Sequence, residues 1–293
     1  MRKRLLAFVL LLVTILGLCS CSDISNDSTF SIRFIDVGQG DSALVECDGH
    51  YMLIDGGETS AGDKVYGILE EKGIQKLDIL AVSHFHTDHY GGLIKALTYA
   101  SKIGVTISNS NYYDSETFRK FEHELEINGT KITVPAAGDK YELGRATIEV
   151  VDSCSVEDND SLVLLITYGK TRFLFTGDIE RSGQLRVAER FEKDGKTQGV
   201  WISLIKMPHH GAYNDNSGLP ENALYRLLFE YNPSFFVISV GANNQYGHPH
   251  KETMDMLSDY VGGQLNGYVY RTDKQGDIIV HSNGKELSFE TSK

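Results

Sequence analysis

Three histidines and one aspartate lie within six residues of one another: His84, His86, Asp88 and His89. An apolar segment, residues 79–82, leads into this cluster, and Gly91-Gly92 follows it. A turn at the end of a strand can direct alternate side chains toward one point, where imidazole and carboxylate together suit Zn²⁺, and also Mn²⁺ or Fe²⁺. A solvated histidine-rich loop is the alternative, but this density of ligand types between an apolar strand and a Gly-Gly turn favours a metal site.

The elements that must position this cluster are short strands and helices. Strands are predicted at 31–36, 42–47, 51–54, 79–82, 131–134, 146–151, 162–168, 172–175, 201–206, 235–240, 277–280 and 286–289. Helices are predicted at 64–72, 91–99, 115–127, 181–193, 221–230 and 251–260. Two β-rich groups, each followed by helices, imply two sheets packed face to face with helices outside. Residues 30–293 contain no internal repeat and no linker-like composition, which predicts a single α/β domain.

The histidine cluster resembles a known signature. His84-x-His86-x-Asp88-His89 is similar to the HxHxDH motif of the metallo-β-lactamase superfamily, which has an αββα four-layer sandwich fold and a one- or two-metal site. Three further motifs that end predicted strands agree with it: Asp55-Gly56-Gly57, Phe175-Thr176-Gly177-Asp178 and Pro208-His209-His210-Gly211-Ala212. The resemblance covers nearly all of the predicted domain, so this fold is expected for the chain.

A narrower resemblance comes from three other segments: Phe34-Ile35-Asp36-Val37-Gly38-Gln39-Gly40-Asp41-Ser42, Asn159-Asp160-Ser161-Leu162-Val163 and Asn244-x-Tyr246-Gly247-His248-Pro249. They are similar to the soluble domain of ComEC-type DNA-uptake proteins. The same subfamily contains surface esterases that remove phosphorylcholine from teichoic acids. The resemblance implies a stand-alone, lipoprotein-like relative, to which a role in DNA uptake does not transfer automatically.

The superfamily motif assigns roles to the ligands. It implies that the first metal is bound by His84 and His86, the second by Asp88 and His89, that Asp178 bridges the two, and that the last ligand is His210. We choose His210 over His209 because His-Gly-Ala resembles the run of small residues that follows the family's final ligand. His209 then touches substrate or supports the ligands, or simply packs in the core.

This stretch of the chain also departs from the family pattern. Many members have a further histidine about twenty residues before the bridging aspartate, but residues 157–161 read Glu-Asp-Asn-Asp-Ser. Either a carboxylate such as Asp160 replaces that histidine, or water partly fills the first site. A site richer in oxygen would favour Mn²⁺ over Zn²⁺. Asn159 and Ser161 are expected to contact substrate or to support the ligands, as is Asp160.

Four more residues are candidates for the site. His248 is expected to bind phosphate or to protonate the leaving group, with a role in stabilising its turn as the alternative. Asp36 and Asp41 flank glycines that let the backbone pass close to the site, and we expect both to brace that loop by hydrogen bonds. Asp55 is expected to be a similar brace.

The implied chemistry is hydrolysis with two divalent ions, Zn²⁺ or Mn²⁺. Such ions lower the pKa of bound water from 15.7 to roughly 7, which supplies hydroxide near neutral pH, and they can hold both oxygens of a phosphodiester displacement. Asp88 and Asp178 would hold the reacting centre, with His248 beside it. The resemblance therefore implies a phosphodiesterase acting on DNA, RNA, or a cell-wall teichoic acid or phosphorylcholine ester.

Charge bears on this choice of substrate. The 293 residues carry 40 Asp and Glu against 28 Lys and Arg, a formal net charge of −12. This balance disfavours a protein that coats nucleic acid. Four cations could still form a local basic patch near the site: Lys206, Lys251, Arg271 and Lys274. Two other functions remain open, namely hydrolysis of a neutral ester, lactone, thioester or β-lactam, and a non-enzymatic surface binding module.

The N-terminal segment is predicted to be an address rather than part of the fold. Arg2-Lys3-Arg4 precedes an apolar run at 5–18, which is shorter than the roughly 20 residues that a spanning helix needs. The sequence before Cys21 resembles a lipobox, so we expect residues 1–21 to be a signal peptide, Cys21 to be lipidated and residues 22–29 to be a tether. A short retained anchor helix is the alternative.

Export and anchoring have two consequences. The protein would lie on the outer face of the cytoplasmic membrane, held by a lipid anchor only, and the sequence indicates no protein partner. Cys47 and Cys154 would be the remaining thiols. They could pair in an exported protein, or each could be buried separately within its strand.

Overall fold

The computed structural model describes residues 29–193, 201–215, 217, 221–263 and 267–293. The predicted signal peptide with Cys21, and the tether as far as residue 28, lie outside the described residues. Within the described part of the chain, no helix is long and apolar enough to cross a membrane.

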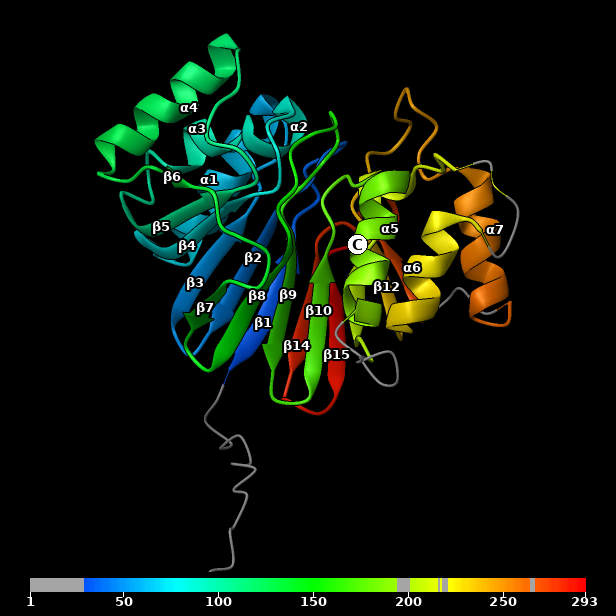
Figure 1. Ribbon diagram of the computed structural model, residues 1–293. Helices are drawn as coiled ribbons and strands as arrows, with labels where there is room; N and C mark the ends of the chain where they lie inside the picture. The colour runs from blue at the N-terminus through cyan, green and yellow to red at the C-terminus, as the bar shows by residue number, and fades with distance from the viewer. Residues whose placement is uncertain (1–28, 194–200, 216, 218–220, 264–266) are drawn as a thin grey trace, which may run out of the picture.

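Two mixed β-sheets form the centre of the molecule (Figure 1). The first has the order β15-β14-β1-β2-β3-β4-β5-β6 and the second the order β13-β12-β11-β10-β9-β8-β7. The first consists of β1 (Phe30–Phe34), β2 (Ala43–Cys47), β3 (His50–Ile54), β4 (Lys76–Val82), β5 (Lys102–Ser108), β6 (Ile132–Thr133), β14 (Ile278–Ser282) and β15 (Leu287–Thr291). The second consists of β7 (Lys140–Leu143), β8 (Ala146–Asp152), β9 (Val163–Tyr168), β10 (Thr171–Phe175), β11 (Leu204–Lys206), β12 (Phe235–Ile238) and β13 (Val269–Arg271).

Alternating side chains of both sheets fill the space between them. In β1 the buried residues are Phe30, Ile32 and Phe34, which share one face because strand side chains alternate. The Phe30 ring stacks on Tyr168 and Phe173 of the other sheet, with centroid distances of 4.7 and 5.1 Å. This apolar layer joins the sheets into one unit.

Helices cover the outer face of each sheet, as Figure 1 shows. The first sheet packs against α1 (Gly62–Glu71), α3 (Leu93–Ala96) and α4 (Glu116–Ile127). The second packs against α5 (Arg181–Lys193), α6 (Ala223–Tyr231) and α7 (Lys251–Tyr260). The short helices are η1 (Thr59–Ala61), α2 (Thr87–Tyr90), η2 (Pro208–Gly211) and α8 (Thr272–Gln275). The predicted αββα sandwich is confirmed.

Several predicted elements have different bounds. Three strands, β5, β7 and β13, were not predicted, and the predicted strand 201–206 contains only β11. The predicted helix 91–99 is only α3, and a separate turn of helix, α2, precedes it. A Cβ on Gly92 would lie 2.1 Å from the Gly56 carbonyl oxygen, so Gly91-Gly92 permits a close backbone approach rather than starting a long helix.

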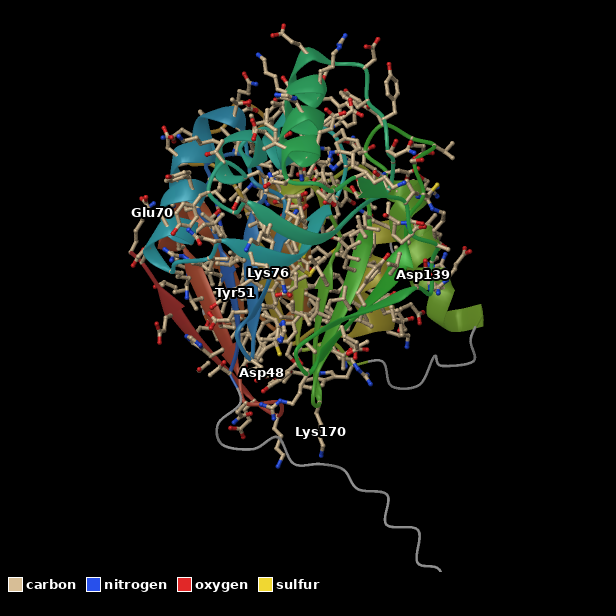
Figure 2. The ribbon with its side chains drawn as sticks, turned by 90° about the vertical axis from the view of Figure 1, so that its left-hand side faces the viewer. Asp48, Tyr51, Glu70, Lys76, Asp139 and Lys170 are labelled. Atoms are coloured by element: carbon tan, nitrogen blue, oxygen red, sulfur yellow. The ribbon has the colours of Figure 1, made fainter. Side chains whose placement is uncertain are left out.

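The polar residues of interest gather at one end of the sandwich. Figure 2 shows Asp48 and Lys170 at the hairpin turns of the opposite end, where β2 meets β3 and β9 meets β10. Strands β3 and β10 start from those turns, so their carboxyl ends lie at the far end of the molecule. Both cysteines are free thiols: Cys47 is buried in β2, and Cys154 follows β8.

Candidate metal centre

Five segments bring the motif residues together at this end of the sandwich. Asp55 follows β3, and the loop after β4 carries His84 and His86 and leads into α2 with Asp88 and His89. Asp178 follows β10, His209 and His210 lie in η2 after β11, and Asp41 lies just before β2. Parallel strand pairs β3–β4 and β10–β11 end side by side, so these loops meet.

One oxygen of Asp178 lies at the middle of the cluster. Asp178 Oδ2 is 3.2 Å from His89 Nε2, 3.4 Å from His210 Nε2 and 3.8 Å from His209 Nε2. Asp88 Oδ2 lies 3.4 Å from the same nitrogen of His210. Ligand atoms of His84, His89 and Asp178 lie within 4.8 Å of one another, and so do those of Asp88, His89 and His210. Two further candidate groups contain Asp41, one with Asp55 and His89 and one with Asp178 and His210, so the donors form overlapping groups.

These residues fit divalent metal ions. The buried Nε2 atoms of His84, His89 and His210 have no hydrogen-bond partner, and neither has Asp178 Oδ1. Imidazole nitrogens and carboxylate oxygens that converge in this way are the donors that Zn²⁺ and Mn²⁺ take. The fold family implies divalent metal ions, and this donor set agrees with it.

The charges of the cluster hold one another in place. Burial raises the pKa of Asp178, but His210 and His89 outweigh it and hold that pKa well below its usual value. Burial lowers the pKa of His89, but Asp178 and Asp55 outweigh it and hold it well above the usual value. The pKa of His84 lies well below the usual value because of burial and the nearby His89.

Neighbouring groups orient each ligand ring. Asp55 Oδ2 lies 3.0 Å from His89 Nδ1, and its Oδ1 accepts a hydrogen bond from the Ser83 backbone N–H at 2.7 Å. His210 Nδ1 donates to the Ser239 carbonyl oxygen at 3.0 Å. Ser83 Oγ lies 3.1 Å from His84 Nδ1. Because these contacts occupy Nδ1, each Nε2 is left to face the cluster. Asp55 therefore contacts both a candidate ligand ring and the backbone of the loop after β4.

His86 lies beside the cluster without joining it. Its ring is 4.5 Å from that of His84, centroid to centroid, but its Nε2 is 3.3 Å from Asp158 Oδ1. Among the described residues, no candidate metal group includes His86.

His209 and His248 lie beside the cluster: His209 Nε2 is 3.8 Å from Asp178 Oδ2, and the ring centroids of His248 and His210 are 6.2 Å apart. His209 Nδ1 contacts Asn214 Nδ2 at 3.1 Å and Glu180 Oε1 at 3.3 Å. The His248 ring lies 5.5 Å from that of His209. Burial and the neighbouring histidines lower the pKa of His248 to about 4. Its ring is thus neutral at neutral pH, which favours binding of a substrate group over the donation of a proton.

Residues 159–161 support the centre from outside. Asp160 forms an ion pair with Arg186 and accepts hydrogen bonds from the N–H groups of residues 156 and 157, at 3.0 and 2.9 Å. The structure does not bring Asp160 to the cluster, so its carboxylate does not stand in for the missing histidine. Ser161 Oγ accepts from the Asp178 N–H at 2.9 Å, and Asn159 Nδ2 donates to Glu180 Oε1 at 2.7 Å.

Asp36 and Asp41, expected to act alike, occupy different surroundings. Asp36 Oδ2 pairs with Lys293 at 2.8 Å, outside the cluster. Asp41 is buried, with Oδ1 3.4 Å from His210 Nδ1 and Oδ2 in contact with Lys206 Nζ. Only Asp41 touches a candidate ligand.

Lys206, named from the sequence as one cation of a possible local patch near the site, lies at the site but is buried, with 2% of its surface exposed. Burial lowers its pKa, but Asp41 and Asp178 outweigh this and raise it above the usual value. Its position within an apolar strand, Leu204-Ile205-Lys206-Met207, is the signal that could have indicated burial. The other three cations of that patch, Lys251, Arg271 and Lys274, each pair with an aspartate, Asp255 or Asp273.

Two cavities flank His86. The larger, about 790 Å³, is lined by residues that include Gln39, Glu58, Asp88, Tyr113 and Tyr246. The smaller, about 370 Å³, is lined by residues that include His84, Tyr112, Tyr113, Glu157 and Asp158. Among the described lining residues of either cavity there is no lysine and no arginine. The approach to the cluster is therefore acidic and aromatic.

Comparisons with known proteins agree with this geometry. The family model described as the metallo-beta-lactamase superfamily matches residues 35–225. ComE operon protein 3 of Bacillus subtilis (strain 168) is 27% identical over 270 residues, covering 84% of this chain and 32% of that protein. Recombination protein 2 of Haemophilus influenzae is 26% identical over 248 residues, covering 81% of this chain and 28% of that protein. The chain thus spans about a third of the length of these curated relatives.

A solved structure has the same fold. The metallo-beta-lactamase fold protein YhfI from Bacillus subtilis superposes with a TM-score of 0.54 and 16% identity, covering 86% of this chain and all of that one. The region that the family model matches, residues 35–225, contains the histidine cluster, Asp178 and His210. The chain therefore belongs to the metallo-beta-lactamase superfamily of metal-dependent hydrolases.

Proposed function

We propose that this protein is a metal-dependent phosphodiesterase that acts outside the cytoplasmic membrane. The observation that carries the proposal is the convergence of three unpartnered Nε2 atoms, those of His84, His89 and His210, on Asp178. Divalent ions held there, Zn²⁺ or Mn²⁺, would act as Lewis acids and lower the pKa of water.

The residues of this chain divide the remaining work. We take His84, His89, His210, Asp88 and Asp178 as the ligands, from four candidate groups that also contain Asp41 and Asp55. His209 and His248, beside these ligands, can donate N–H groups to phosphate oxygens, because a neutral imidazole has one donor nitrogen. Asp55 and Ser83 keep the rings of His89 and His84 in orientation.

Similarity to competence and recombination proteins supports phosphodiester chemistry over hydrolysis of a neutral ester, lactone, thioester or β-lactam. The surroundings of the site support a small phosphodiester over a polynucleotide. A polyanion would approach Glu58, Glu157 and Asp158 without a lysine or arginine among the described lining residues to meet its phosphates. A phosphorylcholine ester carries a quaternary ammonium, which exposed tyrosines such as Tyr112 and Tyr113 can contact through their rings.

Hydrolysis of bis(p-nitrophenyl) phosphate tests the reaction. We expect turnover by the purified protein with added Zn²⁺ or Mn²⁺. We expect this turnover to be lost in Asp178→Asn, which replaces one oxygen of the central carboxylate with an amide NH₂ group. Folded, metal-loaded protein without turnover would contradict the proposal. Faster turnover of a chromogenic β-lactam would favour the alternative hydrolase, and protein purified without chelators that holds no metal would favour a binding module.

Salt dependence separates the two substrate classes. Binding of a nucleic acid weakens steeply as salt rises, because bound counterions are released from its phosphates. For a phosphorylcholine ester, recognised through its small head group, we expect kcat/KM to change little between 50 and 200 mM salt, ionic strengths over which a nucleic-acid binder loses orders of magnitude in affinity. A steep salt dependence on oligonucleotides would reverse this preference.

The location rests on the N-terminal segment, with its basic start, apolar run and Cys21. We expect the full chain to partition with membranes and Cys21→Ala to leave that fraction. Unchanged partition of the variant would contradict the lipid anchor and favour a retained anchor helix.

A further inference from the structure

A buried cation, the ammonium group of Lys206, lies next to the candidate metal ligands. Lys206 ends β11 and is 2% exposed. Its Nζ contacts the Asp41 carboxylate, donates to the Gly177 carbonyl oxygen at 3.2 Å and lies 3.8 Å from Asp178 Oδ1. A buried ion pair loses the hydration of both partners and is often no more stabilising than apolar residues of similar volume. Stability alone therefore gives little reason for a charged pair at this position.

The pair touches two candidate ligands from behind. Asp41 Oδ2 contacts Lys206, and Asp41 Oδ1 lies 3.4 Å from His210 Nδ1. Lys206 faces Asp178 Oδ1, whereas Asp178 Oδ2 faces the Nε2 atoms of His89 and His210. The two oxygens of the central carboxylate thus have different neighbours, an ammonium on one side and imidazoles on the other.

We propose that Lys206 and Asp41 are a positioning pair, which turns one oxygen of Asp178 toward the metal ions and fixes the ring of His210. This inference rests on the metal site of the proposed function. Lys206 attracts Oδ1 and so leaves Oδ2 for the histidine side. Asp41 Oδ1 lies 3.4 Å from His210 Nδ1, which donates to the Ser239 carbonyl oxygen, so the negative charge of Asp41 supports the ring orientation that presents Nε2. Neither residue touches substrate in this scheme.

The pair also sets the charge of the site. Asp41, Asp55 and Asp178 are buried carboxylates within one cluster. Among the lysines and arginines that the structure describes, Lys206 is the one that contacts these carboxylates. Its charge reduces the mutual repulsion of these carboxylates. The ligands therefore stay close together and their reorganisation on metal binding is small.

Replacing both partners separates positioning from simple structural pairing. Lys206→Met alone leaves Asp41 buried and unpaired, and can fail to fold for that reason. The double variant Asp41→Asn with Lys206→Met removes both charges and is expected to fold. Lys251→Met is the matched control, because Lys251 is exposed and pairs with Asp255 within its own helix.

The measurements are urea unfolding of the metal-free protein, Zn²⁺ affinity by chelator competition, and the visible absorption spectrum of the Co²⁺-loaded protein. We expect the double variant to unfold close to the wild-type urea midpoint. Its Zn²⁺ affinity should fall about 10–100-fold, the usual loss when an outer partner of a ligand is removed. Its Co²⁺ spectrum should change, and Lys251→Met should match the wild type in all three.

Wild-type Zn²⁺ affinity and an unchanged Co²⁺ spectrum in the double variant would overturn the inference, and so would a wild-type protein that binds no divalent ion. These readouts are independent of hydrolysis. A wild-type protein that binds Zn²⁺ tightly but does not hydrolyse bis(p-nitrophenyl) phosphate would contradict the proposed function and leave the test of the pair intact.

Discussion

Two aspartates that look alike in the sequence have different roles in the structure. Asp36 and Asp55 each end a predicted strand, and both were expected to brace a loop. Asp55 is buried and fixes His89 and the Ser83 backbone, whereas Asp36 pairs with Lys293 at 2.8 Å. Of these two aspartates, only Asp55 contacts the ring of the candidate ligand His89 and can orient it.

Asp55→Asn should weaken metal binding about 10–100-fold, because the amide cannot accept hydrogen bonds at both positions and the His89 ring loses its orientation. Asp36→Asn is the control and should bind metal like the wild type. Chelator competition with Zn²⁺ measures both. Equal affinities in the two variants would show that Asp55 does not orient the ligand.

Motifs identified most of the cluster at the level of residues, because strand ends place His84, His89, Asp178 and His210 within reach of one another. The motifs could not show which groups surround a charged side chain in the folded protein. Asp160 was a candidate ligand, but in the structure it pairs with Arg186, which lies 26 residues later in the sequence, on a helix. A local sequence pattern does not predict a contact between residues so far apart. The burial of Lys206 and its pairing with Asp41 were not predicted for the same reason.

At the scale of elements, one loop depends on one helix. Residues 153–162 join β8 to β9 and include Glu157 and Asp158, which line the smaller cavity. Arg186 of α5 pairs with Asp152, the last residue of β8, at 3.0 Å, and with Asp160, near the end of this loop. The wall of the cavity is thus attached to the outer helical layer.

Arg186→Met should destabilise the protein by about 3 kcal/mol, because Asp160 is left buried without its charged partner. The loop should also become more sensitive to protease. Lys120→Met is the control, since the exposed pair of Lys120 with Glu116 is worth about 0.5 kcal/mol or less. Urea unfolding and limited proteolysis measure both effects; a loss no larger than that of the control would mean that α5 does not hold the loop.

The layer order was predictable from the alternation of β-rich groups and helices, but several element bounds were not. β5 contains Gly104, whose Cβ would lie 2.5 Å from the Asp78 carbonyl oxygen, and its first half is partly exposed. The segment does alternate, with Ile103, Val105 and Ile107 at every second position, so the pattern of a strand is present although a glycine interrupts it. Pairing with β4 over six residue pairs, a tertiary effect, stabilises β5 despite that glycine.

At the scale of the whole molecule, a group of ion pairs joins distant parts of the chain. Asp277 precedes β14 and pairs with Arg33 of β1 at 2.6 Å and Lys64 of α1 at 2.7 Å. It also accepts a hydrogen bond from the Asp36 N–H at 2.9 Å. The carboxyl-terminal hairpin is thereby fastened to the first strand, to the loop that follows it and to the first long helix.

This arrangement predicts acid sensitivity. Burial raises the pKa of Asp277, but Lys64, the Asp36 N–H and Arg33 outweigh it and hold the pKa below its usual value. A carboxylate whose pKa is lower in the folded than in the unfolded protein stabilises the fold above the unfolded value, about 3.9. That stabilisation is lost as pH falls below 3.9 toward the folded pKa. Asp277→Asn should therefore be about 1–3 kcal/mol less stable than the wild type at pH 7, where partly buried donors lose a charged acceptor. The difference should shrink at pH 3.

Urea unfolding at the two pH values measures the difference, with Asp255→Asn as the control because the Asp255–Lys251 pair is exposed. Asp277 lies outside the metal cluster, so Asp277→Asn should retain the wild-type Zn²⁺ affinity while it loses stability. A difference between Asp277→Asn and wild type that stays constant from pH 7 to pH 3 would mean that the lost stability comes from packing and not from the charge. A parallel fall in Zn²⁺ affinity would show instead that this network and the metal cluster are coupled through β1 and β2, which pair along their whole length.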